Sequence, residues 1–176
     1  GGCADTPRHG SAVIVVSNTS PLTSLAAIGQ LDLMNRLYGQ LHIAEVVWEE
    51  LNAGGYPWPG AKEVAQANWI SRHQVSNREL VLALIRDLDQ GEAESIALAI
   101  ELEADLLILD EREGRRSAKR FGLNVTGVLG VLLEAKAADL IREVRPLVQK
   151  LRDQAGFYLS EDVQQLICQL AGEVAD

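Results

Sequence analysis

The sequence predicts an α/β fold in which a short, mainly parallel sheet lies between two layers of helices, a three-layer αβα sandwich. Short apolar runs, rich in β-branched residues, alternate along the chain with segments of helical periodicity. This alternation is typical of parallel strands connected by helices. The length of 176 residues is sufficient for one domain with a substantial core.

In the first half, β-branched runs and helix start and stop signals define the expected elements. Residues 13–16 form a β-branched run that suits a buried strand. Pro21 opens a helix that is capped by Ser20 or Thr19 and stops at Gly29. The elements expected next are a helix over 31–38, a short strand at 42–43, a helix over 45–51, a loop over 54–60 that is a candidate flap, and an edge strand over 69–75.

In the second half, Asp89 and Glu92 have the spacing of a capping box, which predicts a helix from there to about residue 103. Gly122 has the position of a C-cap glycine. The remaining expected elements are a buried strand over 106–109, a helix over 112–121, a strand over 124–126, and helices over 128–138, 140–154 and 160–171.

Charge and cysteine usage exclude several classes of protein. The formal net charge of −9 argues against a protein that coats nucleic acid through bulk charge. The two cysteines, at opposite ends of the chain, form neither a disulfide scaffold nor a zinc motif, so we expect a cytoplasmic protein. No apolar run reaches the ~20 residues of a membrane span. We expect a flexible leader over 1–11, an α/β domain over 12–140, and helices over 141–176 packed on the same domain.

Acidic and amide side chains follow two of the expected strands. Asn18 follows the first strand, and Asp110 and Glu111 follow the strand over 106–109. Ligands of open parallel sheets bind beyond the carboxyl ends of the strands. Because neither turn has a glycine-rich phosphate motif, dinucleotide and P-loop functions lose support. The remaining oxygen donors suit Mg²⁺ or Mn²⁺.

Two helical glutamates and Asp110 each allow a structural and a functional interpretation. Glu50 lies within the apolar arc of helix 45–51, where a carboxylate either has a cationic or backbone partner or binds a metal in a cleft. The capping box accounts for Glu92 but does not need Glu94. The Glu94 carboxylate therefore either compensates the helix dipole or reaches a cleft. Asp110 either caps the next helix or binds a ligand.

The helix expected over 112–121 is strongly basic. Between residues 112 and 120 the chain has five cations and one acid. Such a helix beside an acidic cluster suits contact with a phosphate backbone, although a solvated face that neutralises neighbouring acids is an equal alternative.

Five segments, in this order, resemble PIN-domain proteins, most closely a VapC-like branch often described only as predicted nucleic-acid-binding proteins. The similarity covers about 13–140. The segments are VVSNTSPL at 15–22, Val46-x-x-x-Glu50-Leu51, GEAESIALA at 91–99, LILDE at 107–111 and GLNVTGVLGVL at 122–132.

The resemblance implies a PIN-like sandwich and a metal-dependent endoribonuclease, in many members the toxin of a toxin–antitoxin pair. In such enzymes, acids at strand and helix ends hold one or two Mg²⁺ or Mn²⁺ ions. Glu50, Glu94 and Asp110 match the family's acids, and Glu111 is a fourth candidate. Asn18 occupies the position of the family's first acid, and its neutral amide oxygen should weaken metal affinity.

The resemblance also implies partners. Arg112, Arg115 and Arg116 are candidates for holding the RNA backbone, and PIN toxins commonly bind an antitoxin. The apolar stripes of 140–154 and 160–171 either complete the core, form the surface of a homodimer or form an antitoxin groove. The alternative function, motivated by the missing acid, is a catalytically weakened or inactive PIN module that binds RNA or a protein partner. A receiver-like phosphoacceptor domain is disfavoured, because the acid pair that such a domain has after its first strand is absent from this sequence.

Overall fold

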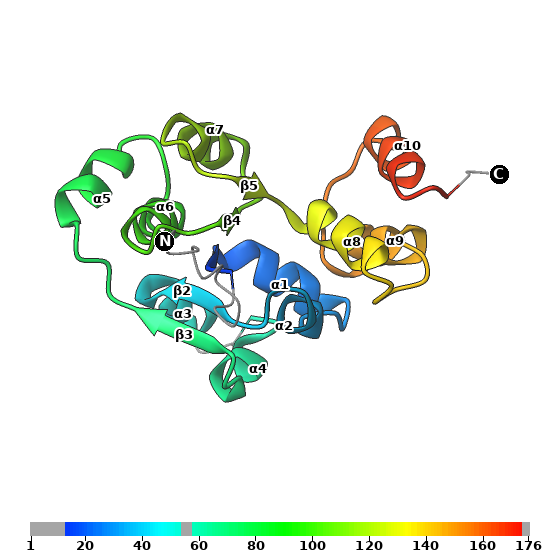
Figure 1. Cartoon of the computed structure of the whole chain (residues 1–176), viewed down its shortest axis with the longest axis horizontal. Helices are drawn as coiled ribbons and strands as arrows, with labels where there is room; N and C mark the ends of the chain where they lie inside the picture. The colour runs from blue at the N-terminus through cyan, green and yellow to red at the C-terminus, as the bar shows by residue number, and fades with distance from the viewer. Residues whose placement is uncertain (1–12, 54–57, 174–176) are drawn as a thin grey trace, which may run out of the picture.

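A five-stranded parallel sheet forms the centre of the computed structural model, which describes residues 13–53 and 58–173. The strands occur in the order β3-β2-β1-β4-β5, and every pairing is parallel (Figure 1). The strands are β1 (Val15–Ser17), β2 (Leu41–Ala44), β3 (Ile70–His73), β4 (Leu106–Ile108) and β5 (Val125–Thr126). The predicted α/β sandwich with a short parallel sheet is therefore confirmed.

Helices connect the strands and continue beyond the last one (Figure 1). They are α1 (Thr19–Ala27), α2 (Asp32–Tyr38), α3 (Glu45–Leu51), α4 (Ala61–Gln66), α5 (Arg78–Leu84), α6 (Gln90–Glu101), α7 (Arg112–Arg120), α8 (Val128–Ala137), α9 (Arg145–Gln154) and α10 (Glu161–Leu170). None of the helices in the described part of the chain is both long and apolar enough to cross a membrane.

The helix α6 is the central element of one helical layer. It packs against β1, β2 and β4, with α3, α5 and α7 beside it, and every residue from Gly91 to Ala99 is buried. The helices α1, α2 and α8 pack on one another away from α6 (Figure 1). Because α6 is enclosed on all sides, acidic side chains in its first turn must either have partners or face a cavity.

Short helices and helix ends account for the differences from the sequence prediction. Neither α4 nor α5 was predicted. The helix α4 has only six residues, and the apolar side chains of α5 and its C-cap lie on two sides, with Val81 and Leu84 buried and Leu82 and Ile85 exposed. The helix expected over 140–154 begins only at Arg145, and Pro146 occupies its first turn, where a missing N–H costs nothing. The leader over 1–11 and residues 54–57 of the expected flap lie outside the described residues.

The C-terminal helices pack on the same core. The helix α9 contacts α1, and α10 contacts α8. A carboxylate after α10 connects them: Glu173 accepts the backbone N–H groups of Val144 and Arg145 at 2.7 and 3.0 Å, and it forms an ion pair with Lys136 of α8 at 2.9 Å. The end of α10 is therefore attached to both neighbouring helices.

Candidate active site

A pocket of about 200 Å³ lies where β1 and β4 end and where α6 and α7 begin. Four carboxylates line it, and the lining residues that the structure describes include no lysine, arginine or histidine. The lining residues are Asn18, Thr19, Ser20, Thr23, Glu50, Trp58, Asp89, Glu92 and Glu111. A cavity with this composition carries concentrated negative charge.

Asn18 is fixed at the end of β1. Its backbone N–H donates to the carbonyl oxygen of Ile108 at 3.0 Å, and its side-chain Oδ1 accepts from the hydroxyl of Ser95 at 3.4 Å. Only 4% of Asn18 is exposed. The residue therefore has a neutral oxygen at the pocket wall, at the position after the first strand where an acid would add charge.

Glu50 points into the pocket from α3, whereas its neighbour Glu49 is exposed. The hydroxyl of Thr19 donates to Glu50 Oε2, and the backbone of Gly91 also hydrogen-bonds this carboxylate. A Cβ atom at position 91 would lie 2.6 Å from Glu50 Oε1, so any larger residue there would displace the Glu50 carboxylate from its present position. Burial, assisted by the charge of Asp89, raises the pKa of Glu50 despite these hydrogen bonds.

The start of α6 provides two more carboxylates. Asp89 is the N-cap, and its Oδ1 accepts the backbone N–H of Glu92 at 2.8 Å, so the predicted cap is present. Glu92 itself is 6% exposed. Burial, together with the neighbouring carboxylates of Asp89 and Glu111, raises the pKa of Glu92 from 4.5 to about 7. Glu92 is thus a buried acid without a cationic partner to offset its charge.

Glu111 completes the pocket from the other side of the β4 terminus. It is the N-cap residue of α7, but its side chain makes no capping hydrogen bond, and the residue is exposed. Its carboxylate is therefore available at the rim of the pocket, beside the more deeply buried Glu92.

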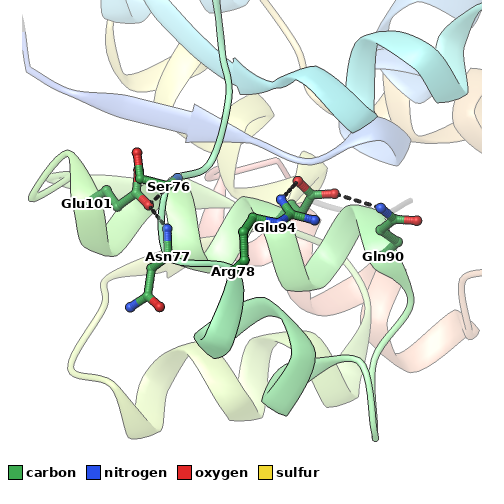
Figure 2. Close-up of polar contacts among 6 residues, drawn as sticks. All are labelled: Ser76, Asn77, Arg78, Gln90, Glu94 and Glu101. Carbon is green, nitrogen blue, oxygen red and sulfur yellow. Dashed lines mark hydrogen bonds and ion pairs between the residues drawn. The ribbon is translucent and has the colours of Figure 1, made fainter.

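Glu94, which the sequence predicts as a ligand, is not among the residues that line the pocket. Its two carboxylate oxygens accept from Arg78 Nη1 at 2.7 Å and from Gln90 Nε2 at 3.0 Å (Figure 2). The neighbouring Glu101 accepts the backbone N–H groups of the two residues before Arg78. These contacts attach α5 to α6 and occupy the Glu94 carboxylate.

The sequence analysis missed Glu92 as a pocket residue because the capping-box spacing already explained it. The Glu92 carboxylate does take part in the cap, because the backbone of Asp89 hydrogen-bonds it, so the sequence carried no separate signal that it also borders a cavity. Asp89 was missed for the same reason, since its capping role gave no indication that its carboxylate also borders a cavity.

Asp110 lies in a second, basic pocket. This pocket has a volume of about 480 Å³, and it is lined by Asp110, Arg112, Arg115, Arg116 and Lys119. The three arginines predicted to hold RNA therefore share one cavity, at the beginning of α7. The carboxylate of Asp110 does not line the acidic pocket.

The Asp110 carboxylate connects β4 to the start of α8. Its Oδ1 accepts the backbone N–H of Val128 at 2.9 Å, and its Oδ2 is buried with no hydrogen-bond partner. A Cβ atom at Gly127 would overlap Asp110 Oδ1 and lie 2.8 Å from Arg115 Nη1, so the packing here is close. Burial raises the pKa of Asp110, and the Val128 hydrogen bond and the charge of Arg115 oppose this effect.

The donor set of the acidic pocket fits a divalent cation, although the described residues contain no preformed group of three or more acidic, histidine or cysteine ligands. All of its polar side chains present oxygen atoms, which Mg²⁺ and Mn²⁺ prefer. Two of its acids, Glu50 and Glu92, have raised pKa values because no positive charge offsets their burial. Ser20, another lining residue, has an Oγ atom that is buried without a hydrogen-bond partner.

Comparison with known proteins identifies the chain from its sequence. The sequence model of one protein family, described as a PIN domain, matches residues 14–173. A search of curated proteins finds none that matches the chain.

Proposed function

The chain belongs to the PIN-domain family, which has a nuclease fold, and we propose that it is a metal-dependent endoribonuclease. The observation that carries the proposal is the pocket with four carboxylates and no described cationic side chain. Like charges in a shared, partly buried pocket repel one another, and a bound divalent cation would remove this repulsion.

In this proposal Glu50, Glu92 and Glu111 hold the cation, and Asn18 supplies a neutral oxygen. Bound Mg²⁺ or Mn²⁺ would lower the pKa of a water molecule and stabilise charge on a phosphate. The protein fixes its donors in advance: Thr19 and Gly91 orient Glu50, and the Asn18 backbone is attached to β4. Asp89 caps α6, so its carboxylate is already partly engaged.

Glu94 and Asp110, which match the family's acids in sequence, have a supporting role in this proposal. Glu94 is bound by Arg78 and Gln90, and Asp110 accepts the N–H of Val128. Each of these carboxylates fixes an element that borders a pocket. We propose that they position the site rather than hold the cation.

The basic pocket supports RNA as the substrate. Arg112, Arg116 and Lys119 are exposed around it, and their charges suit a phosphate backbone. Asp110 and Glu111 are consecutive in sequence, and each lines a different pocket, so the two pockets adjoin at the end of β4. An RNA strand could therefore lie across both, which suits cleavage within a chain.

Cleavage of a mixed single-stranded RNA pool with Mg²⁺, with Mn²⁺ and with chelator tests the proposal. We expect metal-dependent cleavage that Glu92→Gln reduces by about 100-fold or more, as expected for loss of a charged metal ligand. Glu94→Gln is the comparison variant: its carboxylate acts on Glu50 through its charge but is bound by Arg78 and Gln90, so a smaller loss is expected from a positioning residue than from a ligand. Equal losses in both variants, with both folded, would contradict the assignment of Glu92, and metal-independent cleavage would contradict the metal.

A binding module without catalytic activity is the second candidate function, and Asn18 favours it. Without the acid expected after β1, the pocket has one charge fewer to hold the cation. Calorimetric titration with Mn²⁺ distinguishes the two functions: micromolar binding that Glu92→Gln abolishes supports the nuclease, and RNA binding without Mn²⁺ binding supports the module.

The role of a toxin inhibited by an antitoxin rests on the family resemblance. Inducible expression tests it: growth arrest by the wild-type chain, but not by Glu92→Gln, is the expected result. Arrest by both variants would separate the toxicity from the proposed nuclease site.

A further inference from the structure

Trp58 is an exposed tryptophan at the edge of the acidic pocket. The residue is 56% exposed, although tryptophan is highly buried on average in folded proteins, and it lines the same pocket as Glu50 and Glu92. Other large apolar or aromatic residues are exposed in the described part of the chain, but none of them lines either the acidic or the basic pocket. The place of this ring beside carboxylates therefore points to a ligand.

The backbone of Trp58 is held on both sides of the residue. Its N–H donates to the carbonyl oxygen of Leu51 at 3.0 Å, and its own carbonyl oxygen accepts the N–H of Ala61 at 3.0 Å. Gly60, at φ +93°, packs closely on α1, because a Cβ atom there would lie 2.9 Å from the Cβ atom of Ala26. The ring is therefore presented on a fixed backbone, which lowers the entropy cost of binding a ligand to it.

The other two tryptophans are engaged in the fold. The guanidinium carbon of Arg72 lies 4.4 Å from the ring centre of Trp48, and both Trp48 and Trp69 are half-buried against the core. Of the three tryptophans, only Trp58 is exposed. A ligand that stacks on a tryptophan of this chain therefore has one ring to choose.

A planar, uncharged group suits a ring beside four carboxylates. Nucleobases stack on aromatic side chains, and they do so where they are unpaired. A cationic side chain of a protein also suits such a ring, but the adjoining basic pocket repels it. A single strand of RNA suits both pockets, because it offers a base to the ring and phosphates to the arginines.

We propose that Trp58 stacks an unpaired base of the RNA that crosses the acidic pocket, so that the substrate class is single-stranded RNA. This inference rests on the proposed function, because it takes RNA as the ligand of the site. Trp58 lies shortly before α4, whereas the basic pocket lies at the start of α7, and these two helices are on opposite sides of the molecule (Figure 1). The strand therefore runs from the ring, across the acidic pocket, to the arginines.

Binding of a labelled single-stranded RNA with chelator present tests the proposal without cleavage, since neither the ring nor the arginines need the metal. In fluorescence anisotropy we expect Trp58→Ala to weaken binding roughly 10- to 100-fold, as expected for one stacked base, and Trp58→Phe to retain most of the affinity. Tyr158→Ala is the control, since Tyr158 is 89% exposed but lines neither pocket, and it should bind as the wild type does. The duplex form of the same RNA should bind the wild type and Trp58→Ala equally, because its bases are paired.

Tryptophan emission gives a second measurement, which a purely structural role of Trp58 would not change. Single-stranded RNA should quench the emission of the wild type, and Trp58→Phe should lose this quenching, because the remaining tryptophans are half-buried. The proposal would be overturned by equal affinities of the wild type and Trp58→Ala for the single strand, by an equal loss for single strand and duplex, or by a wild type that binds no RNA.

Cleavage assays with Mg²⁺ or Mn²⁺ separate this inference from the proposed nuclease. Stacking predicts that Trp58→Ala raises KM for the single strand more than it lowers kcat. Metal-dependent cleavage with a KM that Trp58→Ala leaves unchanged would overturn the stacking and support the nuclease. Binding that depends on Trp58, from a wild type that cleaves no RNA, would support the stacking and contradict the nuclease.

Discussion

Replacing Glu92 with glutamine should make the metal-free protein more stable at pH 8. The side chain is 6% exposed, and its pKa in the folded protein is about 7, compared with an ordinary value of 4.5. Burial is the largest cause, followed by the charge of Asp89. Because the folded state disfavours the ionised form, the ionised carboxylate destabilises the protein at neutral and higher pH.

The pH dependence follows from the two pKa values. Below about 4.5 both the folded and unfolded chains keep the Glu92 proton, so this group has no net effect. Between 4.5 and 7 only the folded chain keeps it, so the stability of the protein falls as the pH rises. At about 1.36 kcal/mol per pH unit, the 2.5-unit difference amounts to about 3 kcal/mol, and this loss persists above pH 7.

Urea denaturation at pH 5, 6, 7 and 8, with chelator, measures this contribution. We expect the stability difference between Glu92→Gln and the wild type to increase by up to about 3 kcal/mol from pH 5 to pH 8. Glu94→Gln serves as the control and should be destabilising at pH 8, because it breaks the ion pair with Arg78. A difference that stays constant with pH, or a Glu92→Gln variant less stable at pH 8, would refute the reasoning.

Three further substitutions test the pocket and its support. Asn18→Asp adds a fifth carboxylate and should tighten Mn²⁺ binding by roughly tenfold in calorimetry, since ligand charge sets affinity; weaker binding would contradict the place of Asn18 in the site. Gly91→Ala should displace the carboxylate of Glu50 and reduce Mn²⁺ affinity, whereas unchanged affinity would show that Glu50 does not bind the cation. Arg78→Ala leaves the buried carboxylate of Glu94 without its ion-pair partner, so this single variant should lose more thermal stability than the double variant Arg78→Ala with Glu94→Gln. Equal losses in the single and double variants would show that the two side chains are not coupled.

The sequence was sufficient to predict the fold because the sheet depends on strong local signals. The β-branched run before Asn18 and the apolar run before Asp110 became the neighbouring strands β1 and β4. Sequence also distinguished the two adjacent glutamates of α3, since only Glu50 falls on the apolar arc, and Glu49 is indeed exposed. In both cases the periodicity of one element decided the outcome.

The sequence was less informative about the site because the partners of the acids come from distant elements. The Arg78–Glu94 pair joins two helices, one of which had no sequence signal, so nothing local showed that Glu94 is engaged. Likewise, the N–H group that binds Asp110 belongs to the start of α8, 18 residues later. Acids can be placed on an element by periodicity, but whether a cation or a backbone donor satisfies them depends on tertiary packing.

The end of β4 explains how one short segment supplies both an acidic and a basic pocket. Consecutive residues of extended chain point to opposite sides. Asp110 thus faces the arginines of α7 and the start of α8, whereas Glu111 faces Glu92 and the end of β1. The cations of α7 begin at Arg112 and line the pocket that contains Asp110, and none of them lines the acidic pocket. A change that exchanged the two orientations would pair acids with arginines and remove the negative charge on which cation binding depends.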